Sequence, residues 1–466
     1  MASICTSNVT SGFIDLATFD EIEKYLYGGP DATAYFVRET RKATWFTQVP
    51  VVLSRSAGSP AFNQEWSVSI SRAGDYMLQT WLRLTTPSLT YDVASAPYGA
   101  SGRIRWTKNL MHNIIRECCI TFNDLVAARF DNYHLDFWAA FTVPAGKRNG
   151  YNNMIGTYDE LIQGTSGTIP AQTLNLPLPL FYGRDSGVAL PTAALPYNEM
   201  RLNFAFRDWT QLVVLSNETS SGAGNQRAQI TSANLVGGAP VLGNTQVWAN
   251  YAIVSNDERK RMACAPRDIL IEQVQTAPRQ SFTPNTNPTQ SFDIRFSHAI
   301  KVLFFAVRNT TSGADWSVYT TASPITVPGS SAGTTLTNYT PPGSADPIGQ
   351  TSLIYENTNR LAQMGSDYFS LVNPYFNAPV IPGETGYHEY SYSLDFISLD
   401  PMGSTNYGKL TNVSIVPEAS AAAIAASTGS GGLPGSDYTQ TYEFIITAVN
   451  NNIIRVSGGA LGFPVL

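Results

Sequence analysis

From about residue 45 onward, short segments of alternating hydrophobic and polar residues follow one another along the chain. They are rich in β-branched and aromatic residues and are separated by Gly, Pro, Ser and Asn, which is typical of antiparallel strands joined by turns. The pattern predicts an all-β protein. The expected strands are WFTQVPVVL (45–53), EWSVSIS (65–71), DYMLQTWLRL (75–84), IRECCITF (115–122), MRLNFAFR (200–207), VWANYAIV (247–254), RDILIEQVQ (267–275), FDIRFSHAIKVLFFAVR (292–308), YHEYSYSLDF (387–396), LTNVSIV (410–416) and YEFIITAVNNNIIRV (442–456).

Three short helices are also expected, one before this pattern and two within it. Thr18 and Glu21 have the spacing of a capping box, and Ile22, Tyr25 and Leu26 follow on one face of the expected helix. In DNYHLDFWAAF (131–141), the first residue is placed to be the N-cap. SNDE, from residue 255, has the spacing of a second capping box, and ERKRMA continues it as a charged helix to about residue 263.

The helices and the loops divide the chain into parts. We expect an N-terminal arm with a short amphipathic helix (1–44), a first β domain (45–254), a short helical linker (255–264) and a second β domain (265–466). Segments rich in Ser, Gly and Thr predict long exposed loops. These segments are 216–245, 311–350 and 418–438.

The two β domains show weak internal similarity. Three pairs of segments match in the same order, which is what a duplicated domain requires. Each half is then an antiparallel sandwich with the size of an elaborated jelly roll. The pairs are 70–86 with 296–311, 197–207 with 407–417, and 251–256 with 446–451.

Composition narrows the class of protein. Charged residues make up only 14% of the chain, against about 25% in an ordinary soluble protein. Such a protein either covers much of its surface with other chains, or is a secreted β protein rich in Ser, Thr and Asn; both readings are open at this point. The net charge of −6 argues against direct binding to nucleic acid, which requires a basic face.

The lack of recognisable targeting signals and the arrangement of the cysteines predict a soluble protein made in the cytosol. No apolar run approaches the roughly 20 residues that cross a bilayer, and MASICTSNVTSGF lacks the features of a signal peptide. Cys118 and Cys119 are adjacent in an expected strand, so they point to opposite faces and should not pair. We expect most of the four thiols to be buried, and Cys5, in the arm, is the candidate for an intermolecular link.

DPMGSTNYGKL (400–410) contains the spacing of a phosphate-binding loop at Gly403, Gly408 and Lys409. Leu410 stands where a magnesium-binding hydroxyl is required, and a strand pattern follows where a helix is required. The segment is therefore predicted to be a turn between strands.

The rest of the sequence contains only weak matches to known catalytic and metal-binding motifs. His112, His134, His298 and His388 occur singly, so no metal pair is predicted. GSSAG (329–333) fits the expression for a nucleophile elbow, but no helix pattern follows it. We predict no catalytic, cofactor-binding or metal-binding residues and no small-molecule substrate. Two carboxylate pairs stay open as glycosidase candidates, Asp15 with Asp20 and Asp367 with Glu384.

The strongest signal is the proline-punctuated segment LNLPLPLFYGRDSGVALPTAALPYNEMRLNF (174–204). It resembles a signature of the major capsid proteins of nucleocytoplasmic large DNA viruses. The similarity runs from near residue 8 to the C-terminus, and further segments resemble the iridovirus branch of this family. These are SGFIDLAT (11–18), AYFVRET (34–40), IRWTKNLMHN (104–113), FNDLVAARF (122–130), YNNMIG (151–156), RDILIEQVQTAPR (267–279), LIYENTNRL (353–361), MGSDYF (364–369) and DPMGSTNYGKL (400–410).

This resemblance implies a double jelly roll with short helical insertions. It also implies homotrimers, pseudo-hexagonal in outline, that tile an icosahedral shell, with minor capsid proteins and an internal membrane on the inner side. The expected locations are the virion and, during assembly, the host cytoplasm. Two alternatives are a carbohydrate-binding β-sandwich and, more weakly supported, a glycoside hydrolase.

Overall fold

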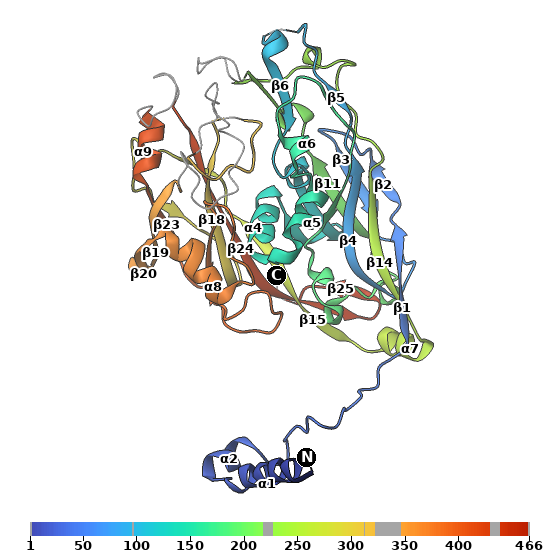
Figure 1. Cartoon of the computed structure of the whole chain (residues 1–466). Helices are drawn as coiled ribbons and strands as arrows, with labels where there is room; N and C mark the ends of the chain where they lie inside the picture. The colour runs from blue at the N-terminus through green and yellow to red at the C-terminus, as the bar shows by residue number, and fades with distance from the viewer. Residues whose placement is uncertain are drawn as a thin grey trace. The chain divides into compact units, whose positions relative to one another are not determined.

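The computed structural model describes residues 2–95, 97–217, 227–311, 313–321, 346–428 and 439–464. The chain divides into two compact units, residues 1–45 and 46–466. The regular structure of the second unit is mainly antiparallel sheet, with short helices between the strands, as Figure 1 shows. Among the described residues, no helix has the length and apolar character needed to span a membrane.

The first unit is helical. It contains α1 (Ala2–Ala17) and α2 (Glu21–Leu26), followed by irregular chain. The predicted capping box at Thr18 and Glu21 is wrong, because Asp20 is the N-cap and Glu23 is its partner. The Asp20 carboxylate accepts from the Glu21 backbone N–H at 2.8 Å, whereas the Thr18 hydroxyl donates to the Asp15 carbonyl at the end of α1. The sequence did not predict α1.

The N-terminal sandwich has two main sheets. In the first, four strands lie in the order β1-β14-β4-β10, and in the second, five lie in the order β2-β3-β11-β7-β8. Burial alternates along β11 as the sequence pattern predicts. The bounds are β1 (Phe46–Val52), β2 (Arg55–Gly58), β3 (Glu65–Ser69), β4 (Tyr76–Thr85), β7 (Ile115–Phe122), β8 (Leu125–Phe130), β10 (Thr173–Pro177), β11 (Met200–Phe206) and β14 (Gln246–Val254), with smaller sheets of β5 (Leu89–Thr90), β6 (Gly102–Trp106), β9 (Thr168–Ile169), β12 (Val213–Asn217) and β13 (Arg227–Ala228).

The C-terminal sandwich repeats this arrangement. One sheet has the strand order β15-β24-β18-β21, and the other has the order β17-β23-β19-β20. The bounds are β15 (Arg267–Thr276), β16 (Gln280–Phe282), β17 (Phe292–Asp293), β18 (Ala299–Asn309), β19 (Ile348–Tyr355), β20 (Thr358–Gly365), β21 (His388–Ser391), β22 (Thr405–Asn406), β23 (Val413–Ala419), β24 (Tyr442–Ser457) and β25 (Ala460–Gly462).

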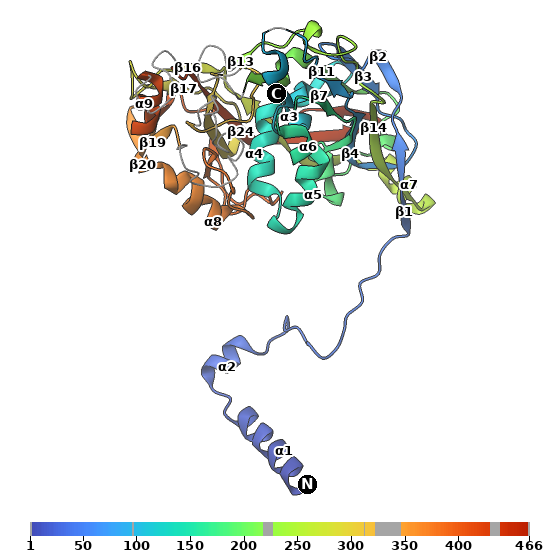
Figure 2. The same cartoon turned by 45° about the horizontal axis from the view of Figure 1, so that its top comes forward.

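The two sandwiches have the same strand order, apart from the edge strand β2 in the first and the short strands β16, β22 and β25 in the second. The three sequence pairs fall on β4 and β18, β11 and β23, and β14 and β24, and each pair occupies the same place in its sheet. In each half, strands from the beginning, the middle and the end of the sequence lie next to one another in the same sheet, as in a jelly roll. The predicted fold, an all-β double jelly roll with short helical insertions, is therefore confirmed, and the two rolls lie side by side in Figures 1 and 2.

Strand β18 is buried on both faces. Leu303, Phe305 and Val307 fill the interior of the C-terminal sandwich, whereas Val302 and Phe304 belong to the core shared with the N-terminal sandwich. This explains why KVLFFAV is a continuous apolar run without alternation.

Short helices lie between the strands. The prediction for α4 is confirmed, because Asp131 caps it and accepts from the His134 backbone N–H at 3.0 Å. The helix α7 is also confirmed, but its N-cap Ser255 makes no capping hydrogen bond, so the predicted box is wrong. Helices with their bounds are α3 (Leu110–Ile114), α4 (Asn132–Thr142), α5 (Ala145–Ile155), α6 (Asp159–Ile162), α7 (Asn256–Cys264), α8 (Asn373–Asn377), α9 (Ala421–Thr428), a π-helical turn (Tyr368–Val372) and 3₁₀ turns at Gly99–Ser101, Phe181–Gly183, Ser186–Val188, Thr192–Ala194, Trp209–Gln211 and Ser232–Asn234.

Several local expectations were wrong. The strand expected over 292–308 breaks before β18, where His298 has a left-handed backbone with φ of 65°. Within the expected loop 418–438, residues 421–428 form α9, because an alanine run has high helix propensity. Cys118 is buried and does not pair with Cys119, but Cys264 is exposed, so the expectation of mostly buried thiols fails. The Cys5 side chain and GSSAG (329–333) lie outside the described residues.

Candidate functional site: the junction between the two sandwiches

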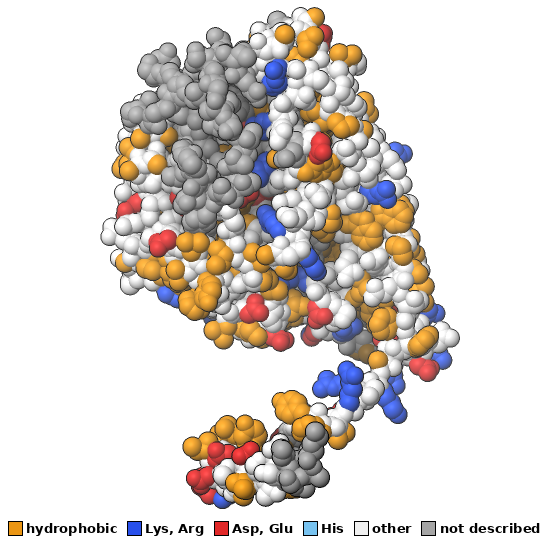
Figure 3. Space-filling model, viewed as in Figure 1, with side chains coloured by type: hydrophobic (Ala, Val, Ile, Leu, Met, Phe, Trp, Pro, Cys, Tyr) orange, Lys and Arg blue, Asp and Glu red, His pale blue; other side chains and the backbone are white. Residues whose placement is uncertain are grey.

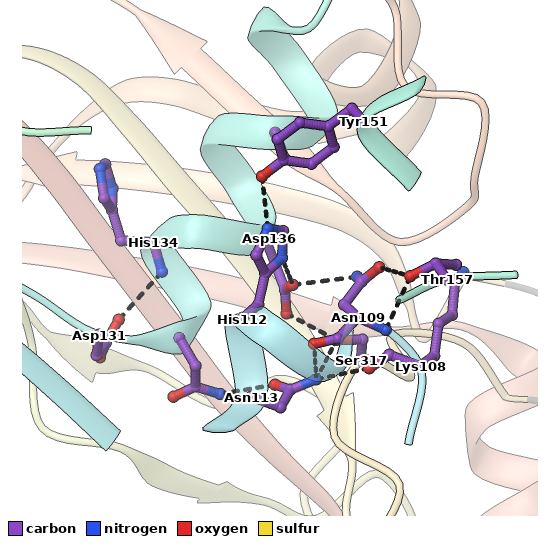
Figure 4. Close-up of polar contacts among 12 residues, drawn as sticks. Lys108, Asn109, His112, Asn113, Asp131, His134, Asp136, Tyr151, Thr157 and Ser317 are labelled. Carbon is purple, nitrogen blue, oxygen red and sulfur yellow. Dashed lines mark hydrogen bonds and ion pairs between the residues drawn. The ribbon is translucent and has the colours of Figure 1, made fainter. Parts of the chain in front are cut away.

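A buried polar network joins the two sandwiches, and Asp136 on α4 is its centre (Figure 4). From the N-terminal sandwich, the Asp136 carboxylate accepts from Asn109 Nδ2 at 3.1 Å and pairs with His112 Nδ1 at 2.7 Å. From the C-terminal sandwich, it accepts from the Ser317 hydroxyl at 2.9 Å and the Tyr319 hydroxyl at 2.7 Å. One carboxylate thus satisfies four buried groups from both sides of the junction.

Asp136 can make its four contacts only if the helices and loops that carry its partners are held in fixed positions. His112 comes from α3, and its other ring nitrogen contacts the Tyr151 hydroxyl on α5 at 2.6 Å. Both the His112 and the Asp136 side chains are essentially inaccessible, with 1% and 0% exposure. Because a buried carboxylate is stable only when it is fully paired, this network favours a single arrangement of the two sandwiches.

Ion pairs and a cation–π stack extend the junction. Arg105 pairs with Asp315 at 2.7 Å, and Lys108 pairs with Glu384. The guanidinium carbons of Arg207 and Arg308 lie 3.6 and 3.9 Å from the centroid of the Trp316 ring. Arginine over an indole face is a favourable contact, particularly where water is excluded. Each of these contacts except Arg308 with Trp316 joins a residue of the first sandwich to one of the second.

An aromatic layer lies next to the polar network. Phe137 and Phe141 on α4 stack on Phe304 of β18, with ring centroids 5.9 and 5.4 Å apart. Tyr387 and Phe396 contact this group edge-on. Aromatic pairs in these geometries stabilise a packed interface beyond their buried area.

A second charged cluster contains Arg184, which belongs to the proline-punctuated segment. Arg184 pairs with Glu272, donates to the Ile397 carbonyl at 2.6 Å and lies over the Trp138 ring at 4.7 Å. Lys301 on β18 pairs with the same glutamate. Burial lowers the pKa of Arg184 to about 10, and burial together with the nearby Arg184 lowers the pKa of Lys301 to about 8.

An apolar pocket of about 930 Å³ opens beside this cluster. We call it the α4–α5 pocket, because it lies between these helices, residues 177–185 and residues 397–400. Its lining includes the apolar residues Trp138, Met154 and Leu178 and the exposed charged residues Lys147, Asp185 and Asp400.

Three of the four histidines, His112, His134 and His388, are buried. Ser366 and Asp346 both contact His388 at the same nitrogen, Nε2, at 2.7 Å. In a serine–histidine–aspartate triad the serine and the aspartate bind opposite nitrogens, so this arrangement cannot relay a proton. Burial lowers the pKa of His134 to about 3 and keeps it neutral. Within the described ranges, no group of three potential metal ligands is present.

The remaining sequence candidates belong to different parts of the structure. The segment 400–410 forms a turn with the short strand β22 and leads to β23, as predicted, and Lys409 is exposed. Asp15 and Asp20 belong to the first unit. Glu384 pairs with Lys108 in the junction, whereas Asp367 is exposed. The sequence predicted the helix α4 but not its role at the junction. The signal available in the sequence was Asp136, an aspartate among the aromatic residues of this helix.

Two jelly rolls with the same strand order, side by side in one chain, define the double jelly-roll class of proteins. Two family models match the sequence: the major capsid protein N-terminus over residues 34–254, and the large eukaryotic DNA virus major capsid protein over residues 258–462. The chain is 67% identical to the major capsid protein of Tipula iridescent virus over 98% of both chains. It is 65% identical to that of Costelytra zealandica iridescent virus over the full length of both.

A solved structure agrees on the fold. The crystal structure of PBCV-1 VP54, fitted into a cryo-EM reconstruction of the virophage Sputnik, superposes with a TM-score of 0.74 at 20% identity, covering 93% of this chain and 100% of that one. The chain belongs to the major capsid protein family of large eukaryotic DNA viruses. It is a structural, non-enzymatic protein that self-assembles into the virion capsid.

Proposed function

We propose that three copies of the chain form a capsomer that is pseudo-hexagonal in outline and tiles an icosahedral shell. The observation that carries this proposal is the repeated strand order of the two sandwiches. Three copies supply six similar barrels, and the buried junction keeps the two barrels of each copy in a constant arrangement. Weak contacts between capsomers then accumulate over the shell.

The same proposal assigns roles to the parts of the chain. Residues 45–254 and 265–466 are the two barrel domains, residues 255–264 are the linker, and residues 1–44 are an arm toward the inner side of the shell. Minor capsid proteins and an internal membrane are the proposed partners there, and assembly takes place in the host cytoplasm. Exposed apolar side chains on α1 and α2 support a docking role for the arm; they include Phe13, Leu16, Ile22 and Leu26.

Light scattering on a sizing column tests the capsomer. We expect the chain released from virus-like particles to have three times the 50.6 kDa mass of one copy. A released species that stays monomeric contradicts the proposal.

Deleting residues 1–30 tests the arm. We expect trimers to form and shell assembly to be impaired, because the deletion leaves both sandwiches intact and removes the exposed apolar helices. Electron microscopy of the particles provides the readout, and normal shells contradict the role of the arm.

A further inference from the structure

An apolar row crosses the outer face of the four-stranded sheet in the N-terminal sandwich. The register places Val52 opposite Trp248 and Trp248 opposite Trp81. Pro177 lies opposite Trp81 on its other side, so the four side chains share one face of β1, β14, β4 and β10. This is the outer face, because the next residue along β4, Leu82, is fully buried. We call these four residues the tryptophan row.

The two tryptophans make a continuous aromatic surface within this row. Their ring planes are 9° apart, with centroids separated by 6.3 Å. Both rings are half-buried, whereas Val52 is 39% exposed and Pro177 is also exposed, so the row is accessible from outside the sheet. Figure 3 shows hydrophobic side chains gathered on the side of the molecule where Figure 1 labels β4 and β14.

Polar side chains border the row on both sides. Two residues further along each strand, the same face presents mainly amides; the neighbours are Gln246, Arg83 and Asn175 on one side, and Pro50, Asn250 and Gln79 on the other. Among these described residues, only Arg83 is charged. An amide side chain both donates and accepts hydrogen bonds, as a hydroxyl group does. The surface therefore suits an uncharged ligand that carries many hydroxyl groups.

The dimensions of the row suit a single sugar chain better than a protein surface. Four strands spaced about 4.8 Å apart give a row about 15 Å long, and side chains on one face recur about every 7 Å along a strand, so the apolar strip covers only about 100 Å². A standard protein interface takes about 800 Å² from each partner. The strand spacing, by contrast, is close to the length of one sugar unit in an extended β-1,4-linked chain.

We propose that the tryptophan row binds a neutral β-1,4-linked glycan that runs across the strands from β1 to β10. One face of a pyranose ring consists of C–H groups, which pack on the rings of Trp81 and Trp248. The hydroxyl groups at the ring edges exchange hydrogen bonds with the amides on both sides. This inference adds a binding function to the structural role of the chain and does not depend on the proposed capsomer.

Isothermal titration calorimetry of the full chain released from virus-like particles tests the site. The probes are cellohexaose and chitohexaose, which are neutral β-1,4-linked chains, and we expect at least one of them to bind. Maltohexaose is the matched control ligand, because it has the same sugar as cellohexaose but an α-1,4 linkage that coils the chain. We expect it to bind at least tenfold more weakly, since a coiled chain cannot lay successive ring faces along one row.

Substitutions locate the binding on the row. Trp81→Ala and Trp248→Ala should each weaken binding at least tenfold, because each removes one aromatic surface, whereas Trp81→Phe should retain most of it. Arg83→Gln should leave binding unchanged, because the ligand is uncharged. Trp45→Ala is the matched control variant, because Trp45 is 86% exposed and belongs to the first unit.

The outcomes separate this inference from the capsomer. If neither β-linked probe binds, or if binding survives in both alanine variants, the glycan site is wrong and the capsomer stands. If no probe binds and the alanine variants change the mass of the released chain, the row is instead a contact between copies. Circular dichroism on heating compares the folding of the variants with that of the parent. The comparison with maltohexaose requires no variant, so it tests the inference even if an alanine variant fails to fold.

Discussion

Two buried carboxyl groups lie near the junction, and their surroundings differ completely. Asp136 contacts four polar groups, two from each sandwich. Glu389, on β21, is 0% exposed, and neither of its carboxylate oxygens has a hydrogen-bond partner. It pairs in register with Phe304 of the aromatic layer. Burial raises the pKa of Glu389 to about 8.

The difference shows two ways in which a fold accommodates a buried acid. Donors that point at a carboxylate compensate for lost hydration, whereas an apolar environment favours the neutral form. Asp136 therefore connects the two sandwiches through its four hydrogen-bonded contacts. Glu389 is protonated near neutral pH and contributes packing without a charge.

The largest expected effect on stability comes from removing the Asp136 carboxylate. Asp136→Ala leaves four polar groups buried without their acceptor, and it should lower the free energy of unfolding by about 3–5 kcal/mol. Urea denaturation followed by fluorescence measures this loss. Asp268→Asn is the control, because Asp268 pairs with Arg455 on the exposed surface at 2.8 Å. A loss no greater than that of the control contradicts the central role of Asp136.

A change of pH should have the next largest effect, through Glu389. The folded protein holds the proton up to a pKa of about 8, whereas the unfolded chain releases it near the ordinary value of 4.5. Between these values the folded state binds more protons, so stability falls as pH rises, by roughly 2–4 kcal/mol between pH 5 and pH 8.

Glu389→Gln should remove this component of the pH dependence. Unfolding free energies of parent and variant, measured from pH 5 to pH 9, give the difference directly. Parallel curves for the two proteins would show that Glu389 does not titrate in this range.

The smallest expected effect is at Lys301. Its partner Glu272 keeps a second cation, Arg184, so Lys301→Met should change stability at pH 7 by about 1 kcal/mol or less. The sign of its pH dependence is opposite to that of Glu389. Its pKa is lowered to about 8, so the parent gains stability as pH rises from about 8 toward the ordinary value of 10.5. The variant should lack this gain, and thermal unfolding at pH 7 and pH 10 compares them.

Much of the fold was predictable because strands and turns depend on short-range patterns. Alternation identified β11, and Asp131 marked the start of α4. The candidate site was much less predictable. The hydroxyl groups of Ser317 and Tyr319 reach Asp136 across 181 and 183 residues of sequence. No local pattern carries that information.

The sequence by itself determined two similar all-β halves, the helix between them and the turn at 400–410, because periodicity, capping residues and glycines act over a few residues. It did not place the capping box of α2, where Thr18 and Asp20 are both acceptable caps and neighbouring backbone geometry selects Asp20. Only the tertiary structure decided the surroundings of Asp136 and Glu389. Both are acids next to aromatic residues in the sequence, and whether distant donors meet them is decided only when the chain folds.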